Sequence, residues 1–315
     1  MHIKYKKSFE NGDVLRVRTR KLALVEGATA GVLFGTAAIF ITFMQSLDTF
    51  SIVFWRLIIA FLTLTAVLLL FKKSFSFNLV KENIIGLLVL SLFLGLHFIF
   101  FVSAVKDTTI LNATVLVNTT PIFSMIVSVL FLKLKPSRYS MAGLMISFAG
   151  VCVIAFAETV ATKGNNFSPS LKGDLEAILA ALVESFYLNC GKKIRSQMSV
   201  LSIMLPIYLL SAIIAGALGI AITGRTLAIS TDVAIILPLI GLGILPTAVA
   251  HTLYFSSLSN LKSFETATMA LLEPIGATVL GIIFFDEIPS YPFILGAAIV
   301  LSGILFVVKQ KNQSV

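Results

Sequence analysis

The chain has 315 residues, of which 57% are hydrophobic and only 12% are charged. Ordinary soluble domains carry about 25% charged residues, so this chain lacks the polar surface that a globular protein in water needs. The composition therefore argues against a soluble protein and favours lipid as the surroundings.

Apolar runs that are long enough to cross a bilayer recur along the chain. A hydrocarbon core of ~30 Å needs ~20 apolar residues of helix. Strands of a membrane barrel would show ~10-residue segments of alternating polarity, and these runs do not alternate. We therefore predict an all-α integral membrane protein with ten transmembrane helices. The predicted spans are 22–43, 52–71, 84–105, 111–132, 141–156, 174–190, 201–222, 233–256, 266–285 and 292–308.

Lysine and arginine are distributed unevenly between the two sides that ten spans define. One side, which includes both terminal tails, carries 19 of them, and the opposite side carries 4. The positive-inside rule assigns the richer side to the cytoplasm. We predict a multi-pass protein of the cell (plasma) membrane with both termini cytoplasmic. The net charge of +9 is then a topology signal and not a nucleic-acid surface.

The second half of the sequence repeats features of the first. With a shift of 153 residues, 9 of the 55 positions over 101–155 are identical, and Pro121 falls on Pro274. A unit of five spans must re-enter the membrane from the opposite side, which predicts two inverted five-helix repeats with a site where they meet. The predicted divisions are a basic cytoplasmic tail (1–21), a first repeat (22–157), a linker (158–173), a second repeat (174–308) and a cytoplasmic tail (309–315).

The loop charges of the two copies support opposite orientations. The loop that holds Lys133 and Lys135 in the first copy corresponds to the loop that holds Asp286 and Glu287 in the second. Basic loops are retained in the cytoplasm. We therefore predict that the basic pair faces the cytoplasm and the acidic pair faces the outside.

Trp55 and Arg56 lie near the predicted outer end of the second span. An aromatic ring at the membrane interface and a guanidinium that snorkels to water explain this pair without a ligand. We favour this interpretation, and contact with a substrate carboxylate is the alternative.

Two histidines occupy spans that the 153-residue shift pairs, His97 in the third and His251 in the eighth. Histidine changes its charge near neutral pH, which makes the pair a candidate for the transport path. Hydrogen bonds between helices are the simpler interpretation. No carboxylate or cysteine stands at metal-ligand spacing beside either residue, so we predict no metal site.

The fourth span places Asn118 and Thr120 within the three residues before Pro121. Their amide and hydroxyl groups are candidates for a cavity lining, with helix packing as the alternative. Pro121 and its counterpart Pro274 are predicted to bend their helices, because proline removes a backbone donor and clashes with the preceding turn.

Two carboxyl groups lie deep in predicted spans. Glu184 is ten residues after Asp174, ~15 Å along a helix, on a small-residue face that also carries Tyr187. Glu273 directly precedes Pro274. Ionisable groups inside a membrane are functional candidates, so we assign both acids to substrate binding or coupling. The alternatives are a protonated carboxyl paired to a neighbouring helix for Glu184 and a helix-bracing hydrogen bond for Glu273.

Three stretches of the sequence resemble a known family. They are FGTAAIF in the first span, FWRLIIA in the second, and ATMALLEPIGATVLGIIFFDEIPSYPFILGAAIVLSGI across the last two. Over residues 22–308 the chain resembles the EamA group of the drug/metabolite transporter superfamily. The resemblance implies a ten-helix transporter of small metabolites with its cavity between two halves. The first half departs from the pattern, because Thr120 stands where Glu273 stands in the second.

We predict a secondary transporter, not an enzyme, that exports small metabolites such as amino acids or similar amphipathic solutes by alternating access. No phosphate-binding loop of the G-x-x-x-x-G-K-[ST] type occurs, so neither ATP nor another cofactor is expected. Aromatic candidates such as Tyr254, and few intramembrane cations besides Arg56, favour amino acids over phosphorylated sugars. An intramembrane enzyme or a scaffold membrane protein is the alternative. We expect a monomer, with a homodimer as the second choice.

Overall fold

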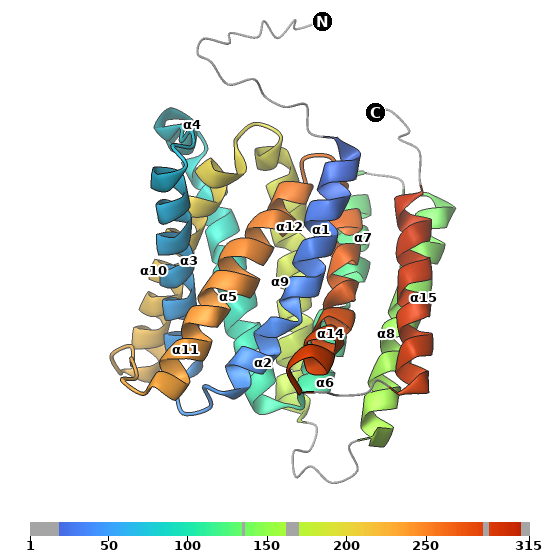
Figure 1. Ribbon diagram of the computed structural model, residues 1–315. Coiled ribbons are helices and arrows are strands. Elements are labelled where there is room, and N and C mark those ends of the chain that lie inside the picture. The colour runs from blue at the N-terminus through green and yellow to red at the C-terminus, as the bar shows by residue number, and fades with distance from the viewer. Residues whose placement is uncertain (1–18, 134–135, 162–169, 286–289, 310–315) are drawn as a thin grey trace, which may run out of the picture.

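The computed structural model describes residues 19–133, 136–161, 170–285 and 290–309, and every regular element within them is helical. These elements form one bundle whose long helices run between an upper and a lower end (Figure 1). In chain order they are α1 (Arg20–Phe34), α2 (Thr36–Thr42), α3 (Thr49–Leu70), α4 (Phe77–Glu82), α5 (Ile84–Asp107), α6 (Ile110–Val117), α7 (Thr120–Leu132), α8 (Arg138–Ala161), α9 (Leu171–Arg195), α10 (Val200–Thr223), α11 (Val233–Leu242), the π-helix η1 (Gly243–His251), α12 (Thr252–Ser257), α13 (Ser263–Met269), the 3₁₀ turn η2 (Ala270–Leu272), α14 (Glu273–Phe285) and α15 (Tyr291–Val308).

Among the described residues, eight helical stretches are long and apolar enough to cross a membrane, and they correspond to eight of the ten predicted spans. The predicted spans 174–190 and 266–285 are not among these eight. The first lies in α9, which carries basic side chains in its last turn and an acidic one in its first. The second is divided among α13, η2 and α14. Lys135, Asp286 and Glu287 lie outside the described residues.

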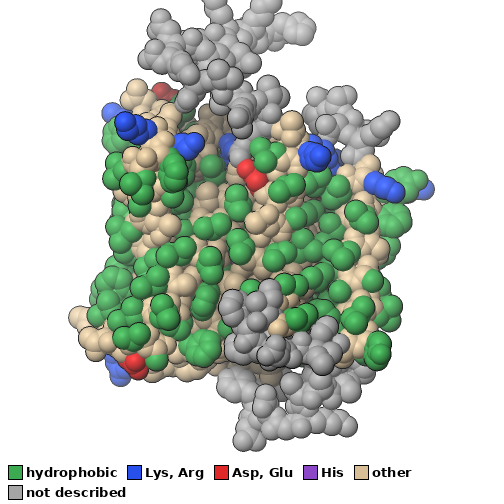
Figure 2. Space-filling view, viewed as in Figure 1, with side chains coloured by type: hydrophobic (Ala, Val, Ile, Leu, Met, Phe, Trp, Pro, Cys, Tyr) green, Lys and Arg blue, Asp and Glu red, His purple; other side chains and the backbone are tan. Residues whose placement is uncertain are grey.

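Apolar side chains face outward and several charged side chains are buried, as in a protein embedded in a lipid bilayer. Hydrophobic side chains cover the visible outer face between the two ends, and the Lys and Arg side chains gather at the ends, mostly the upper one (Figure 2). Ile85 and Leu70 are among the large exposed apolar residues, whereas Arg56, His97 and Glu184 are buried. This inverted distribution fits a helical membrane protein, in which the backbone hydrogen bonds are satisfied within each span.

Helices α8 and α15 pack side by side and run in opposite directions (Figure 1). Glycines allow their backbones to meet, because Gly143 lies against Gly303 and Gly150 lies against Gly296. A Cβ atom on Gly143 would stand 2.7 Å from the Gly303 carbonyl oxygen. Small residues at such contacts are a common way for membrane helices to associate.

Several membrane-crossing stretches are interrupted part of the way along. The α-helix is interrupted between α6 and α7, and again at η2 between α13 and α14. Pro121 is the second residue of α7, and Pro274 is the second residue of α14. Proline is tolerated there because the first-turn N–H groups have no partner within the helix. The prolines therefore stand at helix breaks and do not kink a continuous helix, which differs from the predicted bends.

Candidate functional site

A cavity of about 50 Å³ lies inside the bundle, between segments from both halves of the sequence. This volume is small beside the roughly 300–1,000 Å³ of typical ligand pockets. A metabolite that needs a pocket of that size does not fit in this arrangement of the helices. The lining residues are Phe34, Ala37, Arg56, His97, Phe98, Phe101, Val117, Asn118, Thr120, Glu184, Pro246, His251, Tyr254, Ala270 and Glu273.

Glu184 and His97 face each other across the α5–α9 contact, which is one of the main contacts of the bundle. Glu184 Oε2 lies 3.4 Å from His97 Nδ1. His97 Nδ1 is also 3.1 Å from the Ala180 carbonyl oxygen. A carbonyl only accepts, so this contact needs a proton on Nδ1. Glu184 lines the cavity and is 4% exposed, and its Oε2 is a buried acceptor that makes no hydrogen bond.

Glu273 connects the interruption between α6 and α7 to the interruption between η2 and α14 through a hydrogen bond. Asn118, at the end of α6, donates from Nδ2 to Glu273 Oε2 at 3.2 Å, and both side chains are buried. The same amide donates to the Thr114 carbonyl at 2.8 Å. Glu273 is the first residue of α14, where a negative charge interacts favourably with the helix dipole. The hydroxyl of Thr120 is satisfied locally by the Val117 carbonyl at 2.7 Å.

The π-helix η1 places His251 at the cavity and brings Thr247 to Arg56. The His251 ring contacts four aromatic rings: those of His97 at 5.9 Å between centroids, Phe98 at 4.7 Å, Phe34 at 4.8 Å and Tyr254 at 6.3 Å. His251 Nδ1 is buried without a hydrogen-bond partner. A π-helical turn shifts side-chain positions relative to an α-helix and is often found at functional sites.

Arg56 is buried, at 1% exposure, and lines the cavity. Its Nε and Nη2 donate to the Thr247 hydroxyl oxygen at 3.1 and 2.9 Å, and its guanidinium carbon lies 3.8 Å from the Phe98 ring centroid. The favoured interpretation of a snorkelling guanidinium is therefore wrong for Arg56. The chain turns this residue inward, whereas Trp55 donates from Nε1 to the Ala228 carbonyl at 2.9 Å in a solvent-accessible contact.

Tyr187 is a predicted candidate that does not line the cavity. Its hydroxyl lies 3.5 Å from Met204 Sδ and its ring packs on Phe255, so it belongs to the packing behind Glu184. Sequence reasoning missed Thr247, although it is a polar residue beside a proline inside a span, as Thr120 and Glu273 are. Among the described residues, no three His, Cys, Asp or Glu side chains are grouped as metal ligands.

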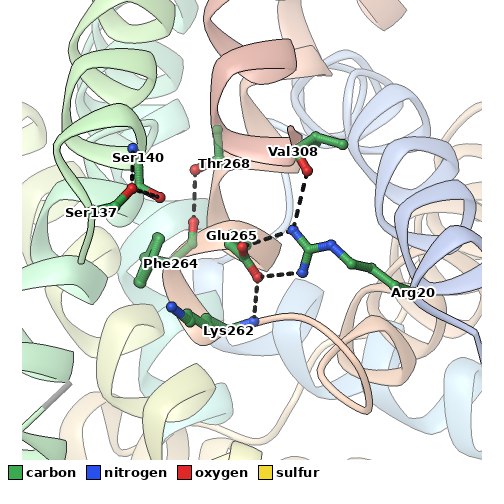
Figure 3. Close-up of polar contacts among 8 residues, drawn as sticks. All are labelled: Arg20, Ser137, Ser140, Lys262, Phe264, Glu265, Thr268 and Val308. Atoms are coloured by element: carbon green, nitrogen blue, oxygen red, sulfur yellow. Dashed lines mark hydrogen bonds and ion pairs between the residues drawn. The ribbon is translucent and has the colours of Figure 1, made fainter. Parts of the chain in front are cut away.

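The upper end of the bundle holds a polar cluster between α1 and the start of α13 (Figure 3). Arg20 binds Glu265 through both carboxylate oxygens, with Nη2–Oε1 at 2.9 Å and Nη1–Oε2 at 3.1 Å. Arg20 Nη2 also reaches the Val308 carbonyl at 3.4 Å, and the Lys262 backbone N–H donates to Glu265 Oε2 at 2.8 Å. This upper cluster ties three distant parts of the chain together.

The lower end holds a second cluster, centred on Asp174 at the start of α9. Asn112 Nδ2 lies 3.2 and 3.3 Å from the two Asp174 carboxylate oxygens, and the Thr108 hydroxyl donates to Asp174 Oδ1 at 2.8 Å. Beside it, Lys172 Nζ pairs with Asp107 Oδ2 at 2.8 Å. This lower cluster ties α9 to the segments that join α5 and α6.

Comparison with known proteins gives consistent results. The sequence model of the EamA-like transporter family matches two separate segments, 22–156 and 171–309. The uncharacterized transporter YcxC of Bacillus subtilis is 22% identical over 83% of this chain and 84% of its own. The uncharacterized transporter YxxF of the same organism is 23% identical over 94% and 93%. An uncharacterized transporter of Archaeoglobus fulgidus is 23% identical over 86% and 91%.

A solved crystal structure shares the fold. It superposes with a TM-score of 0.75 over 91% of this chain and 96% of the other, at 17% sequence identity.

Proposed function

Because the chain belongs to the EamA-like transporter family, we propose that it is a secondary transporter that carries small metabolites across the membrane by alternating access. The observation that carries the proposal is the cavity inside the bundle, which collects buried ionisable side chains from both halves of the sequence. Such groups are rare inside membrane proteins and are typical of substrate or ion paths. The transporter names of the relatives argue in the same direction and against an enzyme.

We further propose ten spans in two inverted five-helix repeats, with α9 and the α13–η2–α14 segment as the remaining two. The two segments matched by the family model support the division. The α8–α15 contact supports the inversion. The Ser147 hydroxyl donates to the carbonyl of Val300, which is its own counterpart under the 153-residue shift, at 3.1 Å. A residue that meets its own counterpart between antiparallel helices is expected beside a pseudo-two-fold axis in the membrane plane.

Alternating access is supported by the clusters at the two ends. The cavity is too small for a metabolite, and polar contacts hold the helices together both above and below it. We propose that substrate enters when one cluster separates and leaves when the other does.

For the substrate we propose amino acids or similar amphipathic solutes, with export across the plasma membrane as the direction. Aromatic rings and carboxyl groups line the cavity together, and Arg56 is the lining residue with a fixed positive charge. The termini are assigned to the cytoplasm because α1 begins and α15 ends at the upper end, where most Lys and Arg side chains of Figure 2 lie.

The test is flux in proteoliposomes loaded with radiolabelled amino acids. We expect faster release than from protein-free vesicles. Glu184→Gln should slow release or change its pH dependence between about pH 5 and 8, because glutamine keeps the volume but cannot release a proton. Glu82→Gln, at an exposed position on α4, is the matched control. Release at the protein-free rate for every solute contradicts the transport proposal, and an unchanged pH profile removes the role of Glu184.

A further inference from the structure

Arg56 is a buried cation without a buried anion. Its hydrogen bonds go to a neutral hydroxyl, that of Thr247, and its Nη1 atom has no partner. Among the described residues, no carboxylate lies within ion-pair distance of the guanidinium. Phe98 covers one face of the guanidinium, and Arg56 is among the residues that line the cavity.

Burial of Arg56 without a counter-charge costs the protein free energy of folding when no ligand is bound. Moving a charge out of water into a protein interior costs several kcal/mol unless a counter-charge and hydrogen bonds compensate it. The cation–π contact and the Thr247 bonds compensate only part of this. A planar anion that accepts hydrogen bonds from Nη1 would supply the missing counter-charge. Carboxylates bind the planar guanidinium group of arginine in this way.

We propose that Arg56 is the anchor for a carboxylate group of the transported solute, so that the solute is an organic carboxylate that enters the cavity carboxylate first. The inference rests on the proposed transport function for its physiological role, but the binding step can be measured without transport. Thr247 fixes the guanidinium, because its hydroxyl oxygen accepts from Nε and Nη2 while its proton goes to the Leu242 carbonyl at 2.6 Å.

The other lining groups define the rest of the ligand. Glu184 Oε2 and His251 Nδ1 are also buried without hydrogen-bond partners, so the lining residues include an unsatisfied carboxylate oxygen and an unsatisfied imidazole nitrogen in addition to the unsatisfied cation. An ammonium group would satisfy Glu184, and an apolar side chain would fit against the rings of Phe34 and Phe98. An α-amino acid carries all three features, whereas a simple carboxylate carries two.

The experiment measures binding to the purified full chain in detergent, by calorimetry and by thermal shift. The probes are L-leucine and L-phenylalanine, their decarboxylated amines isopentylamine and phenethylamine, and the amine-free acids 4-methylpentanoate and 3-phenylpropanoate. We expect the four carboxylates to bind and to raise the melting temperature. The two amines should bind roughly 10- to 100-fold more weakly than the matching amino acids. Tighter binding of the amino acids than of the amine-free acids would identify the zwitterion as the preferred ligand.

Variants separate anchoring from a structural role. Arg56→Gln should weaken carboxylate binding by roughly 10- to 100-fold and leave amine binding unchanged. Its melting temperature without ligand should equal or exceed that of the parent, because a buried unpaired charge is removed. Arg56→Lys keeps the charge but loses the fork, so we expect intermediate binding. Arg225→Gln removes the same charge from an exposed loop and should change nothing.

Several outcomes would overturn the assignment: none of the four carboxylates binds the parent, the amines bind as tightly as the acids, or Arg56→Gln binds the acids like the parent. The parent's own preference for acids over amines does not depend on any variant folding. Carboxylate binding without flux would contradict the transport proposal and leave this inference standing. Flux that does not depend on Arg56 would contradict this inference and leave the transport proposal standing.

Discussion

At each end of the bundle, polar side chains connect the first half of the sequence to the second. The residues involved occupy corresponding positions of the two halves, but the contacts they make differ. Under the 153-residue shift, Glu265 of the upper cluster corresponds to Asn112 of the lower one, and Arg20 corresponds to the residue next to Asp174. At the upper end the contact is an arginine–carboxylate pair with two hydrogen bonds. At the lower end the Asp174 carboxylate accepts from the neutral Asn112 amide and Thr108 hydroxyl, beside the exposed Lys172–Asp107 pair.

This difference indicates that the two ends resist opening unequally. The upper pair is partly buried, with side-chain exposures of 21% for Arg20 and 3% for Glu265. Both ends use a carboxylate acceptor, but the upper contact adds a charged donor and a bidentate geometry, which strengthen it. We therefore expect the upper end to require more free energy to separate than the lower end, and the predictions below test this order.

The largest expected effect is the sidedness of the two ends. We expect Lys133→Cys, at the end of α7, to face the cytoplasm and Ser290→Cys, at the start of α15, to face the outside, because these helices end and begin at opposite ends of the bundle (Figure 1). Both would be made after replacement of Cys152 and Cys190 by serine. An impermeant maleimide added to intact cells should label position 290 and not 133. Labelling of both from one side would end the assignment of the two clusters to opposite membrane faces.

The next effect concerns the upper cluster. Glu265→Gln removes the charge but keeps an oxygen for the Lys262 N–H, so it isolates the ion pair from the helix cap. We expect a loss of about 2 kcal/mol, seen as a lower melting temperature, because the Arg20 guanidinium loses its charged partner. The double variant with Arg20→Gln should recover part of the loss. If neither single variant melts below the parent, the pair contributes nothing to holding this end.

A smaller effect is expected at the lower cluster. Asp174→Asn keeps the shape of the side chain but replaces a charged acceptor by a neutral one for the Thr108 hydroxyl. The expected loss is about 1 kcal/mol. In the proteoliposome assay this variant should alter flux less than Glu265→Gln does. A melting temperature lower than that of Glu265→Gln would reverse the proposed order of the two ends.

Sequence reasoning found much of the cavity because polar groups inside apolar runs are conspicuous. Glu184, Glu273, His97 and His251 were selected in this way, and all four line the cavity. The free-energy cost of placing such groups in lipid makes an inward orientation nearly obligatory. Eight predicted spans correspond to helices that are long and apolar enough to cross a membrane. Helix α9 is not among them, because it carries Glu184 in its middle as well as charged residues at its two ends.

The remaining site residues depended on information that a sequence pattern lacks. Arg56 looked like an interfacial residue by its distance from the helix end, yet its direction is set by Thr247, which a π-helix brings to it. Helical periodicity does not predict a π-helix. The lining phenylalanines, such as Phe98, have the same composition signal as phenylalanines that face lipid, such as Phe131. Only tertiary packing separates the two groups.

The smallest predicted effect is the response of the two ends to salt. Raising NaCl from about 0.1 M to about 1 M shortens the screening length from ~10 Å to ~3 Å, which weakens exposed ion pairs much more than buried ones. The lower Lys172–Asp107 pair is open to solvent, with exposures of 71% and 33%. Lys172→Gln should therefore lower stability by at most a few tenths of a kcal/mol at low salt, and this difference should vanish at high salt.

The upper pair should behave differently in the same measurement. Glu265 is nearly enclosed, so the melting difference between the parent and Glu265→Gln should persist at about 1 M NaCl. Thermal melts of the parent and both variants at two salt concentrations give the comparison directly. If the Glu265 difference vanished with salt as completely as the Lys172 difference, the upper contact would behave as a surface pair. The two ends would then be held with similar strength, because the stronger upper contact depends on burial as much as on charge.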